Sequence, residues 1–238
     1  MKPWKSFLLN TYYHASRPWR WRYRRVHNRT GLTPVMSLFY HRVADDHPNG
    51  WTISRSGFEQ QLDWLQENVE LVSLYEAQQR IKNRYNDKPC VAITFDDGYA
   101  ENCEHALPLL IKRKIPCTYF VCTSHIVNGL PFPHDVERGT PFPPNTVEQL
   151  KALAGSGIEI GAHTRTHANL GIINDEQQLQ DEVIDATRHL EQLIDRPIRY
   201  FAFPYGMPEN LNDRTFQLCK EAGLHGVCSA YGGYNFPG

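Results

Sequence analysis

The stretch VAITFDDG, Val91–Gly98, joins an apolar, strand-like run directly to two neighbouring carboxylates and a glycine. Similar runs recur along the chain, separated by stretches in which apolar residues repeat every three or four positions, the spacing of a helix face. The runs are Val35–Val43, Glu70–Ser73, Cys90–Phe95, Cys117–Thr123, Glu159–His163, Tyr200–Phe203 and Gly226–Ser229. Strand then helix, repeated, predicts α/β architecture: a distorted (β/α)7-type barrel with mainly parallel strands.

Residue types that cap helices mark the expected helix boundaries. The clearest helical pattern is Asp175–Ile194, where Leu179, Val183, Ala186, Leu190 and Ile194 fall on one face. Capping-box sequences predict helix starts at Ser56-x-x-Glu59, Ser73-x-x-Glu76 and Thr146-x-x-Gln149. Left-handed glycines after helix ends are expected at Gly155, Gly157 and Gly223. The Pro- and Gly-rich segment Asn128–Pro144 predicts a long surface loop.

The composition is that of a globular protein that needs no disulfides. Of the 238 residues, 41% are hydrophobic and 21% charged, so no fibrous or disordered class fits. A chain of this length buries roughly 70–75% of its unfolded surface. The six cysteines form no CxxC pair and mostly lie in apolar stretches, which favours buried, reduced thiols.

The first thirty residues differ from the remainder in charge. They hold eight Lys and Arg and no Asp or Glu, whereas the remainder has 17 basic and 26 acidic residues, a net −9. The basic residues alternate with Trp, Tyr and Phe, which favours contact with an anionic membrane; a packed or mobile extension is the alternative. Nucleic acid is not expected as a partner, because the acidic remainder repels phosphate. We expect residues 1–30 to form an extension and residues 31–238 the functional domain.

No apolar run approaches the roughly 20 residues that span a bilayer, and Phe7-Leu8-Leu9 is too short for a signal-peptide core. A cytoplasmic or peripheral membrane location is therefore expected. Nothing obvious closes the fold after Tyr234-Asn235-Phe236-Pro237-Gly238, which suggests a chain truncated at its C-terminus. The oligomeric state stays open.

Three strand ends carry polar clusters, and in such folds functional groups gather where strands end. Asp96 and Asp97 follow the first, and their environments decide whether they bind metal or take a proton. His163 and His167 follow the second and converge on one ion if the chain coils between them. The third ends in Pro204-Tyr205-Gly206, a turn whose N–H groups face a pocket and stabilise an oxyanion if they lie near the metal.

In this order, the clusters resemble the polysaccharide deacetylase family, also called carbohydrate esterase family 4. TFDDG at Thr94–Gly98 matches its first motif, and His163–His167 matches its second, H-[S/T]-x-x-H. The resemblance covers about Pro34 to Ala230. It implies Asp96 as catalytic base, the Tyr205 N–H as oxyanion donor, Thr164 as part of the histidine turn, and Asp97, His163 and His167 as metal ligands. Zinc is the expected ion, with cobalt, nickel, manganese and iron as alternatives.

The sequence departs from the family pattern at two places. Ala202 stands where the family carries an Arg that tethers the catalytic base; Arg199 and Arg165 are the candidate substitutes. The late histidine that acts as general acid has no counterpart. His41, at the end of an early strand, is similar to the relocated histidine of bacterial poly-N-acetylglucosamine deacetylases, and a structural strand-capping role is its alternative.

The expected function is metal-dependent hydrolysis of N-acetyl groups of an amino-sugar polysaccharide or glycan, releasing acetate. His134, Asp135 and Pro204 are candidate substrate-binding residues, and Tyr231–Asn235 is a candidate for sugar stacking. Two alternatives remain open at this point. One is an amidohydrolase for a small cyclic or formyl amide. The other is an inactive metal-binding domain of a membrane assembly, which Ala202 favours and Asp96 argues against.

Overall fold

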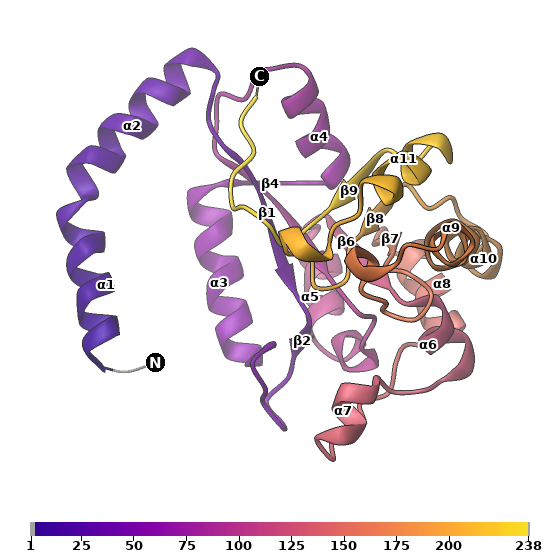
Figure 1. Cartoon of the computed structure of the whole chain (residues 1–238). Coiled ribbons are helices and arrows are strands. Elements are labelled where there is room, and N and C mark those ends of the chain that lie inside the picture. Colours follow the sequence, from indigo (N-terminus) through magenta and orange to yellow (C-terminus); the bar gives the residue numbers. More distant parts are fainter. Residues whose placement is uncertain (1–2, 238) are drawn as a thin grey trace.

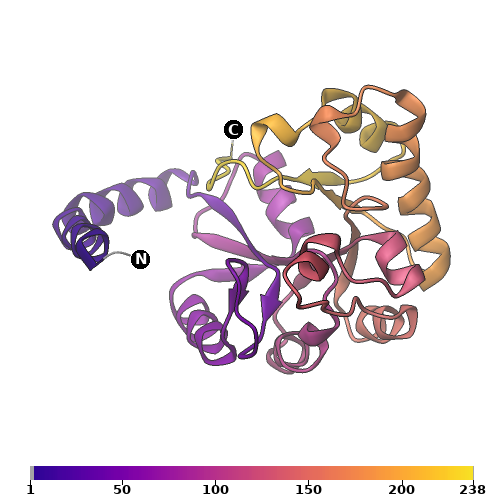
Figure 2. The ribbon, with the colours of Figure 1, turned by 60° about the horizontal axis from the view of Figure 1, so that its bottom comes forward.

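The computed structural model describes residues 3–237, so Met1, Lys2 and Gly238 of the two expected segments lie outside the described residues. A seven-stranded parallel sheet curls into a half-barrel (Figures 1 and 2). Its strands are β1 (Val35–Tyr40), β4 (Glu70–Val72), β5 (Cys90–Phe95), β6 (Cys117–Val121), β7 (Glu159–Ala162), β8 (Tyr200–Ala202) and β9 (Gly226–Cys228). A small separate sheet pairs β2 (Arg42–Val43) with β3 (Thr52–Ile53). The predicted fold class is confirmed, and every predicted run contains a strand.

The sheet runs in the order β1-β5-β6-β7-β8-β9. Strand β1 pairs with β5 over its whole length, so β4 and β6 share the other edge of β5: β4 pairs with Cys90–Ala92 and β6 with Ile93–Phe95. The end strands β1 and β9 do not pair within the described residues. Instead, Asn235 bridges to Val35, with backbone N–H···O distances of 2.8 and 2.9 Å.

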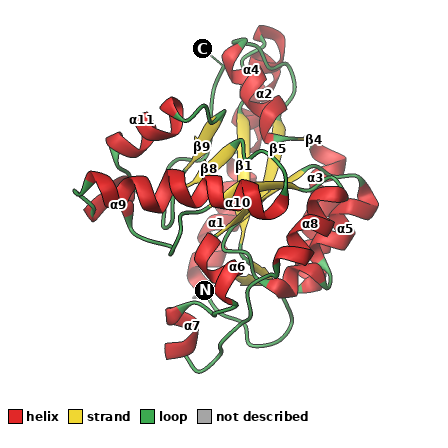
Figure 3. Ribbon diagram, turned by 90° about the vertical axis from the view of Figure 1, so that its right-hand side faces the viewer, coloured by secondary structure: helices red, strands yellow, loops and turns green. Residues whose placement is uncertain are grey.

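Helices surround the outside of the curled sheet (Figures 2 and 3). They are α3 (Arg55–Asn68), α4 (Leu74–Lys82), α5 (Ala106–Arg113), α6 (Thr123–Asn128), α7 (Pro133–Glu137), α8 (Val147–Gly155), α9 (Glu176–Gln180), α10 (Ala186–Ile194) and α11 (Asp213–Glu221). The main core contains Phe58 of α3, Leu107 of α5 and Phe95 of β5, all fully buried. Alternation along β5 turns Ala92 to the opposite face, where it packs with Ala202 and with Ala77 of α4.

The helix boundaries confirm some predicted caps and correct others. Ser73 accepts a hydrogen bond from the Glu76 N–H, and Thr146 forms a complete capping box with Gln149. The box predicted at Ser56 is wrong: α3 starts two residues earlier, because Ser54 has the extended backbone of an N-cap and accepts from the Gly57 N–H. Gly157 and Gly223 are left-handed as predicted, whereas Gly155 is the last residue of α8.

The predicted helix Asp175–Ile194 forms one rod across the outside of the strands (Figure 3). Asp175 caps it, and all five predicted apolar positions are buried. A π-helical turn at Asp181–Asp185 interrupts the α-helix, and such insertions are frequent at functional sites.

The prediction of a plain surface loop at Asn128–Pro144 is wrong. The segment contains α7, and it buries Phe132 and Phe142 in a small core with Tyr99 and Cys122. Removal of these rings from water holds the segment against the domain.

The N-terminal residues form two helices, α1 (Pro3–Ala15) and α2 (Arg17–Thr30), which stand apart from the sheet and its helices in both views (Figures 1 and 2). Among the described residues, no helix is long and apolar enough to cross a bilayer. All six cysteines are free thiols, and four are buried, which confirms the predicted chemistry.

Candidate metal centre and active-site cavity

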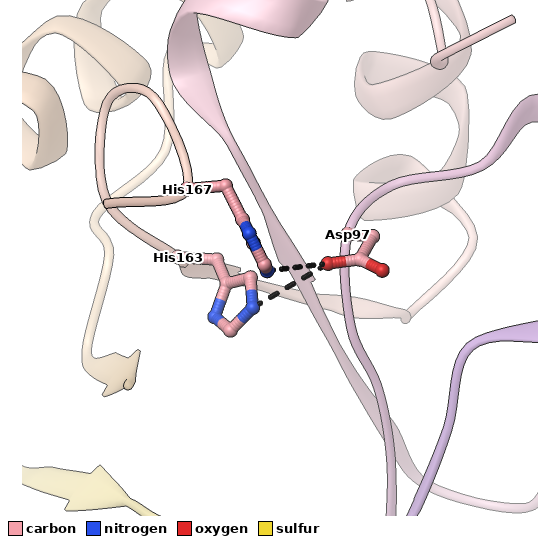
Figure 4. A group of neighbouring side chains, drawn as sticks. All are labelled: Asp97, His163 and His167. Atoms are coloured by element: carbon pink, nitrogen blue, oxygen red, sulfur yellow. Dashed lines mark ion pairs between the residues drawn. The ribbon is translucent and has the colours of Figure 1, made fainter. Parts of the chain in front are cut away.

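The carboxyl ends of β5 and β7 bring the three predicted ligands together. Asp97 follows β5, His163 follows β7 at once, and His167 lies four residues later (Figure 4). Oδ1 of Asp97 is 3.5 Å from Nε2 of His163 and 3.3 Å from Nε2 of His167. One ligand atom from each residue lies within 4.8 Å of the others. Three ligand atoms at these distances from one another form a site in which a single metal ion can bind all three.

The chemistry of these atoms fits a divalent cation. Oδ1 of Asp97 is buried and makes no hydrogen bond with the described residues. Nδ1 of His163 donates to the Ala202 carbonyl at 2.9 Å, which leaves the Nε2 lone pair of a neutral ring facing Asp97. Two imidazoles and one carboxylate leave further coordination positions open, as in catalytic sites.

The electrostatic environments of the two aspartates support different roles for them, with Asp97 as metal ligand and Asp96 as catalytic base. Burial acts to raise the pKa of the Asp97 carboxyl, but interactions with His163 and His167 outweigh it and hold that pKa well below its usual range. Burial raises the pKa of the neighbouring Asp96 carboxyl, although the imidazoles of His163 and His41 oppose this. Asp97 is therefore the permanent anion, and Asp96 the carboxylate more ready to accept a proton.

Four residues of the site have left-handed backbones that non-glycine residues seldom adopt: Asp97 (φ 74°), Thr164 (φ 66°), His167 (φ 63°) and Tyr205 (φ 63°). Such conformations cost of order 1–3 kcal/mol each and persist only where surrounding contacts impose them. They let consecutive residues at the strand ends turn toward one point, which a regular strand does not allow.

Glu182, which the sequence patterns did not single out, makes contacts that hold the backbone between His163 and His167 in its observed conformation. Its carboxylate accepts hydrogen bonds from the backbone N–H groups of Arg165 and Thr166, both at 3.0 Å, and from the Thr166 hydroxyl at 2.7 Å. The π-helical turn carries this buried side chain. Glu182 thus holds the loop between the two histidines. The Thr164 hydroxyl is buried without a hydrogen-bond partner among the described residues.

Asp96 lines the cavity beside the metal ligands, and none of the described residues donates a hydrogen bond to its carboxylate. The two arginines considered as substitutes for the one missing at Ala202 are paired elsewhere. Arg199 binds Glu159 at 2.6 Å, and Arg165 binds Asp181 at 2.7 Å. Neither tethers Asp96, so that expectation is wrong.

His41 lies at the same site, but the predicted strand Val35–Val43 breaks there. Its Nε2 is 4.0 Å from Oδ2 of Asp97, and its ring lies against Trp51 with centroids 4.8 Å apart. The fully buried Asn102 holds the break: its amide donates to the His41 carbonyl at 2.7 Å and accepts from the Val43 N–H at 3.1 Å. Neither Trp51 nor Asn102 carries a local sequence signal.

These groups share one cavity of about 820 Å³, whose walls include Asp96, the metal ligands, His41, His134 and Tyr205. His134 Nε2 lies 3.3 Å from the Tyr99 hydroxyl. Of the other two candidate substrate-binding residues, Asp135 is fully buried and accepts from the Tyr99 hydroxyl at 2.8 Å, and Pro204 is buried. Both are buried, and neither lines the cavity.

Tyr205 and the C-terminal segment complete the cavity wall. The exposed Tyr205 ring lies 5.0 Å from the His167 ring. The backbone N–H of Tyr205 has no acceptor among the described residues. Tyr231–Asn235 also lines the cavity, with exposed rings at Tyr231 and Tyr234.

A curled parallel sheet with two histidines and one aspartate at its carboxyl edge, beside a second free carboxylate, defines an α/β half-barrel with a catalytic type of metal centre. The model of one family, polysaccharide deacetylase, matches residues 83–227. The chain belongs to the polysaccharide deacetylase family.

Individual relatives agree with this assignment. YxkH of Bacillus subtilis (strain 168), named as a candidate polysaccharide deacetylase, is 27% identical over 188 residues, which cover 78% of this chain and 61% of YxkH. The poly-β-1,6-N-acetyl-D-glucosamine N-deacetylase of Staphylococcus aureus (strain N315) is 26% identical over 213 residues, which cover 80% of this chain and 70% of that protein. The structure of IcaB from Ammonifex degensii superposes with a TM-score of 0.71 at 29% identity, covering 87% and 88% of the two chains.

Proposed function

We propose that this protein hydrolyses N-acetyl groups of an amino-sugar polysaccharide, releasing acetate and leaving free amines. The observation that carries the proposal is the site itself: Asp97, His163 and His167 converge on one point, and Asp96 lines the same cavity without a hydrogen-bonding partner among the described residues. A structural metal site requires no such spare carboxylate. Membership of the polysaccharide deacetylase family supports the same chemistry.

Each group at the site has a task in this reaction. Asp97, His163 and His167 would hold a divalent ion, with zinc as the first candidate, and the ion would supply Lewis acidity for attack on the acetyl group. Asp96 accepts the proton of the water whose oxygen attacks the carbonyl carbon. The unpaired Tyr205 N–H donates to the carbonyl oxygen as negative charge develops there. His41 gives a proton to the amide nitrogen as the carbon–nitrogen bond breaks, so that the sugar leaves as an amine.

The walls of the cavity favour a glycan over a small cyclic or formyl amide. Trp51, Tyr205, Tyr231 and Tyr234 line the cavity, and each exposes more than half of its surface. Exposed aromatic rings present flat apolar faces with polar edges, which suits the apolar faces of sugar rings. The S. aureus relative bears the name of a poly-β-1,6-N-acetyl-D-glucosamine deacetylase, so this polymer is the first substrate to test.

An inactive metal-binding domain is the second candidate, because Ala202 replaces the arginine expected to tether the catalytic base and the structure offers no substitute. The test is acetate release from β-1,6-linked N-acetylglucosamine oligomers, beside a small formyl amide, with and without a chelator. We expect metal-dependent release of acetate from the oligomers. Turnover of the small amide alone would support the amidohydrolase, and metal binding without turnover of either substrate would support the inactive domain.

A further inference from the structure

The helices α1 and α2 carry a charge opposite to that of the domain behind them. Residues 1–30 contain eight Lys and Arg and no acidic residue, whereas residues 31–238 contain 17 basic and 26 acidic residues, a net −9. The two helices contact each other and project away from the sheet and its helices in both views (Figures 1 and 2). Positive charge is therefore concentrated on one protruding element.

The same element exposes large apolar side chains. Phe7 is 71% exposed, Trp19 64% and Trp21 61%. A single exposed aromatic residue is common on protein surfaces, but several on one pair of helices mark an interaction surface.

Apolar side chains of α2 recur at helical spacing among the cations, with Trp19 and Val26 exposed and Tyr23 half-buried. In α2, Trp19, Tyr23 and Val26 recur at i, i+4 and i+7, the spacing of one helix face, and the Trp19 and Tyr23 rings stack with centroids 5.5 Å apart. Arg25 lies over the Trp21 ring at 5.2 Å. Arginine guanidinium groups beside amphipathic rings suit the boundary between lipid phosphates and acyl chains.

We propose that α1 and α2 form an interfacial anchor that docks the protein onto an anionic lipid bilayer. The α2 face that carries Trp19, Tyr23 and Val26 lies in the headgroup region, and the arginines contact lipid phosphates. A bilayer satisfies both properties of the surface at once, whereas a neutral N-acetylated glycan has no charge to match the cations. Nucleic acid matches the cations but not the exposed apolar side chains, such as Phe7 and Val26. This proposal does not rest on the deacetylase function.

The test is co-sedimentation of the full chain with phosphatidylcholine vesicles, with and without phosphatidylglycerol. The first variant changes Arg20, Arg22 and Arg25 to Gln, and the second changes Trp19 and Val26, both exposed on one face of α2, to Ser. The charge-matched control changes the exposed Lys151, Arg188 and Lys220 of the domain to Gln. Circular dichroism checks that each variant retains its helices.

We expect binding only to the anionic vesicles, and weaker binding at 1 M salt, where the screening length falls from about 10 to about 3 Å. Each cation near the surface contributes a factor of about five, so the arginine variant loses about a hundredfold in partition coefficient. The variant of Trp19 and Val26 also binds more weakly, and the control binds like wild type. Equal losses in the control and the arginine variant would overturn the proposal. So would release from the vesicles by DNA at equal phosphate concentration, or an unchanged partition coefficient for the arginine variant.

Discussion

Replacing Glu182 by alanine tests how the loop with the two histidines is held. The buried carboxylate accepts three hydrogen bonds from this loop: from the N–H groups of Arg165 and Thr166 at 3.0 Å, and from the Thr166 hydroxyl at 2.7 Å. Alanine removes this acceptor: the exposed Thr166 loses both of its hydrogen bonds to Glu182, whereas the Arg165 N–H keeps its bond to the Glu182 backbone carbonyl at 2.9 Å. His167 is the next residue along the chain, so its ring loses the support that aims it at Asp97.

The size of the effect follows from these contacts. Hydrogen bonds to a charged group contribute about 1.5–3 kcal/mol each, but neighbouring bonds are not additive and water can enter the space left by the side chain. We therefore expect Glu182→Ala to lower the free energy of unfolding by about 2–4 kcal/mol. Loss of a group that orients a metal ligand lowers metal affinity about 10–100-fold. Glu182→Gln keeps the shape and one carbonyl acceptor for the two N–H groups, so its affinity for metal should stay within a few-fold of wild type.

Urea unfolding of the metal-free proteins measures the first effect, and competition for zinc with a chromophoric chelator measures the second. Comparison of the two variants separates loss of the acceptor from loss of charge. An alanine variant that binds zinc as tightly as wild type would refute the role given to Glu182. Equal weakening of metal binding by both variants would assign the effect to charge instead of loop support.

Three further substitutions test separate parts of the structure. His163→Ala should abolish stoichiometric binding of a divalent ion while the fold survives, as elemental analysis and circular dichroism would show; full metal content would contradict the ligand assignment. His41→Ala should cut the rate of acetate release about 10²-fold or more at unchanged metal content, and a near-wild-type rate would move the proton-donor role elsewhere. Thr146→Ala removes the capping box of α8 and should cost about 1 kcal/mol in urea unfolding without changing activity; an unchanged midpoint would mean that the cap adds no stability.

The sequence was enough to predict a distorted barrel of mainly parallel strands, because each strand of the large sheet lies in a β-rich run and most runs are separated by helical patterns. It did not predict where the first run breaks. The break at His41 depends on Asn102, which lies 61 residues further along the chain and binds the His41 carbonyl. The start of α3 was misplaced for a local reason, since Ser54 and Ser56 are both cap-forming residues and only the backbone geometry distinguishes them.

The candidate site was predictable to the extent that its residues follow strands. Asp97, His163 and His167 converge because the carboxyl ends of parallel strands meet at one edge, and two local motifs show which residues stand there. The residues that support them have no such signal. Glu182 reaches the histidine loop through a π-helical turn that no spacing pattern reveals.

In the loop that contains α7, residue type led to a wrong prediction of a substrate-binding residue. Asp135 has the polarity and the loop position of a substrate-binding residue, but the packing of Phe132 and Phe142 turns it inward to the Tyr99 hydroxyl.

A metal titration of activity tests the central claim most directly, namely that one divalent ion held by Asp97, His163 and His167 works with the unbound carboxylate of Asp96. Metal-free wild type and Asp96→Asn are titrated with zinc while bound metal and acetate release from N-acetylglucosamine oligomers are measured together. Wild-type activity should rise linearly to one ion per chain. The Asn variant should bind one ion with similar affinity and lose about 10²–10⁴-fold in rate. Loss of the metal from the Asn variant would show that the two aspartates have been assigned in reverse, and a wild-type rate at one bound ion would contradict the account.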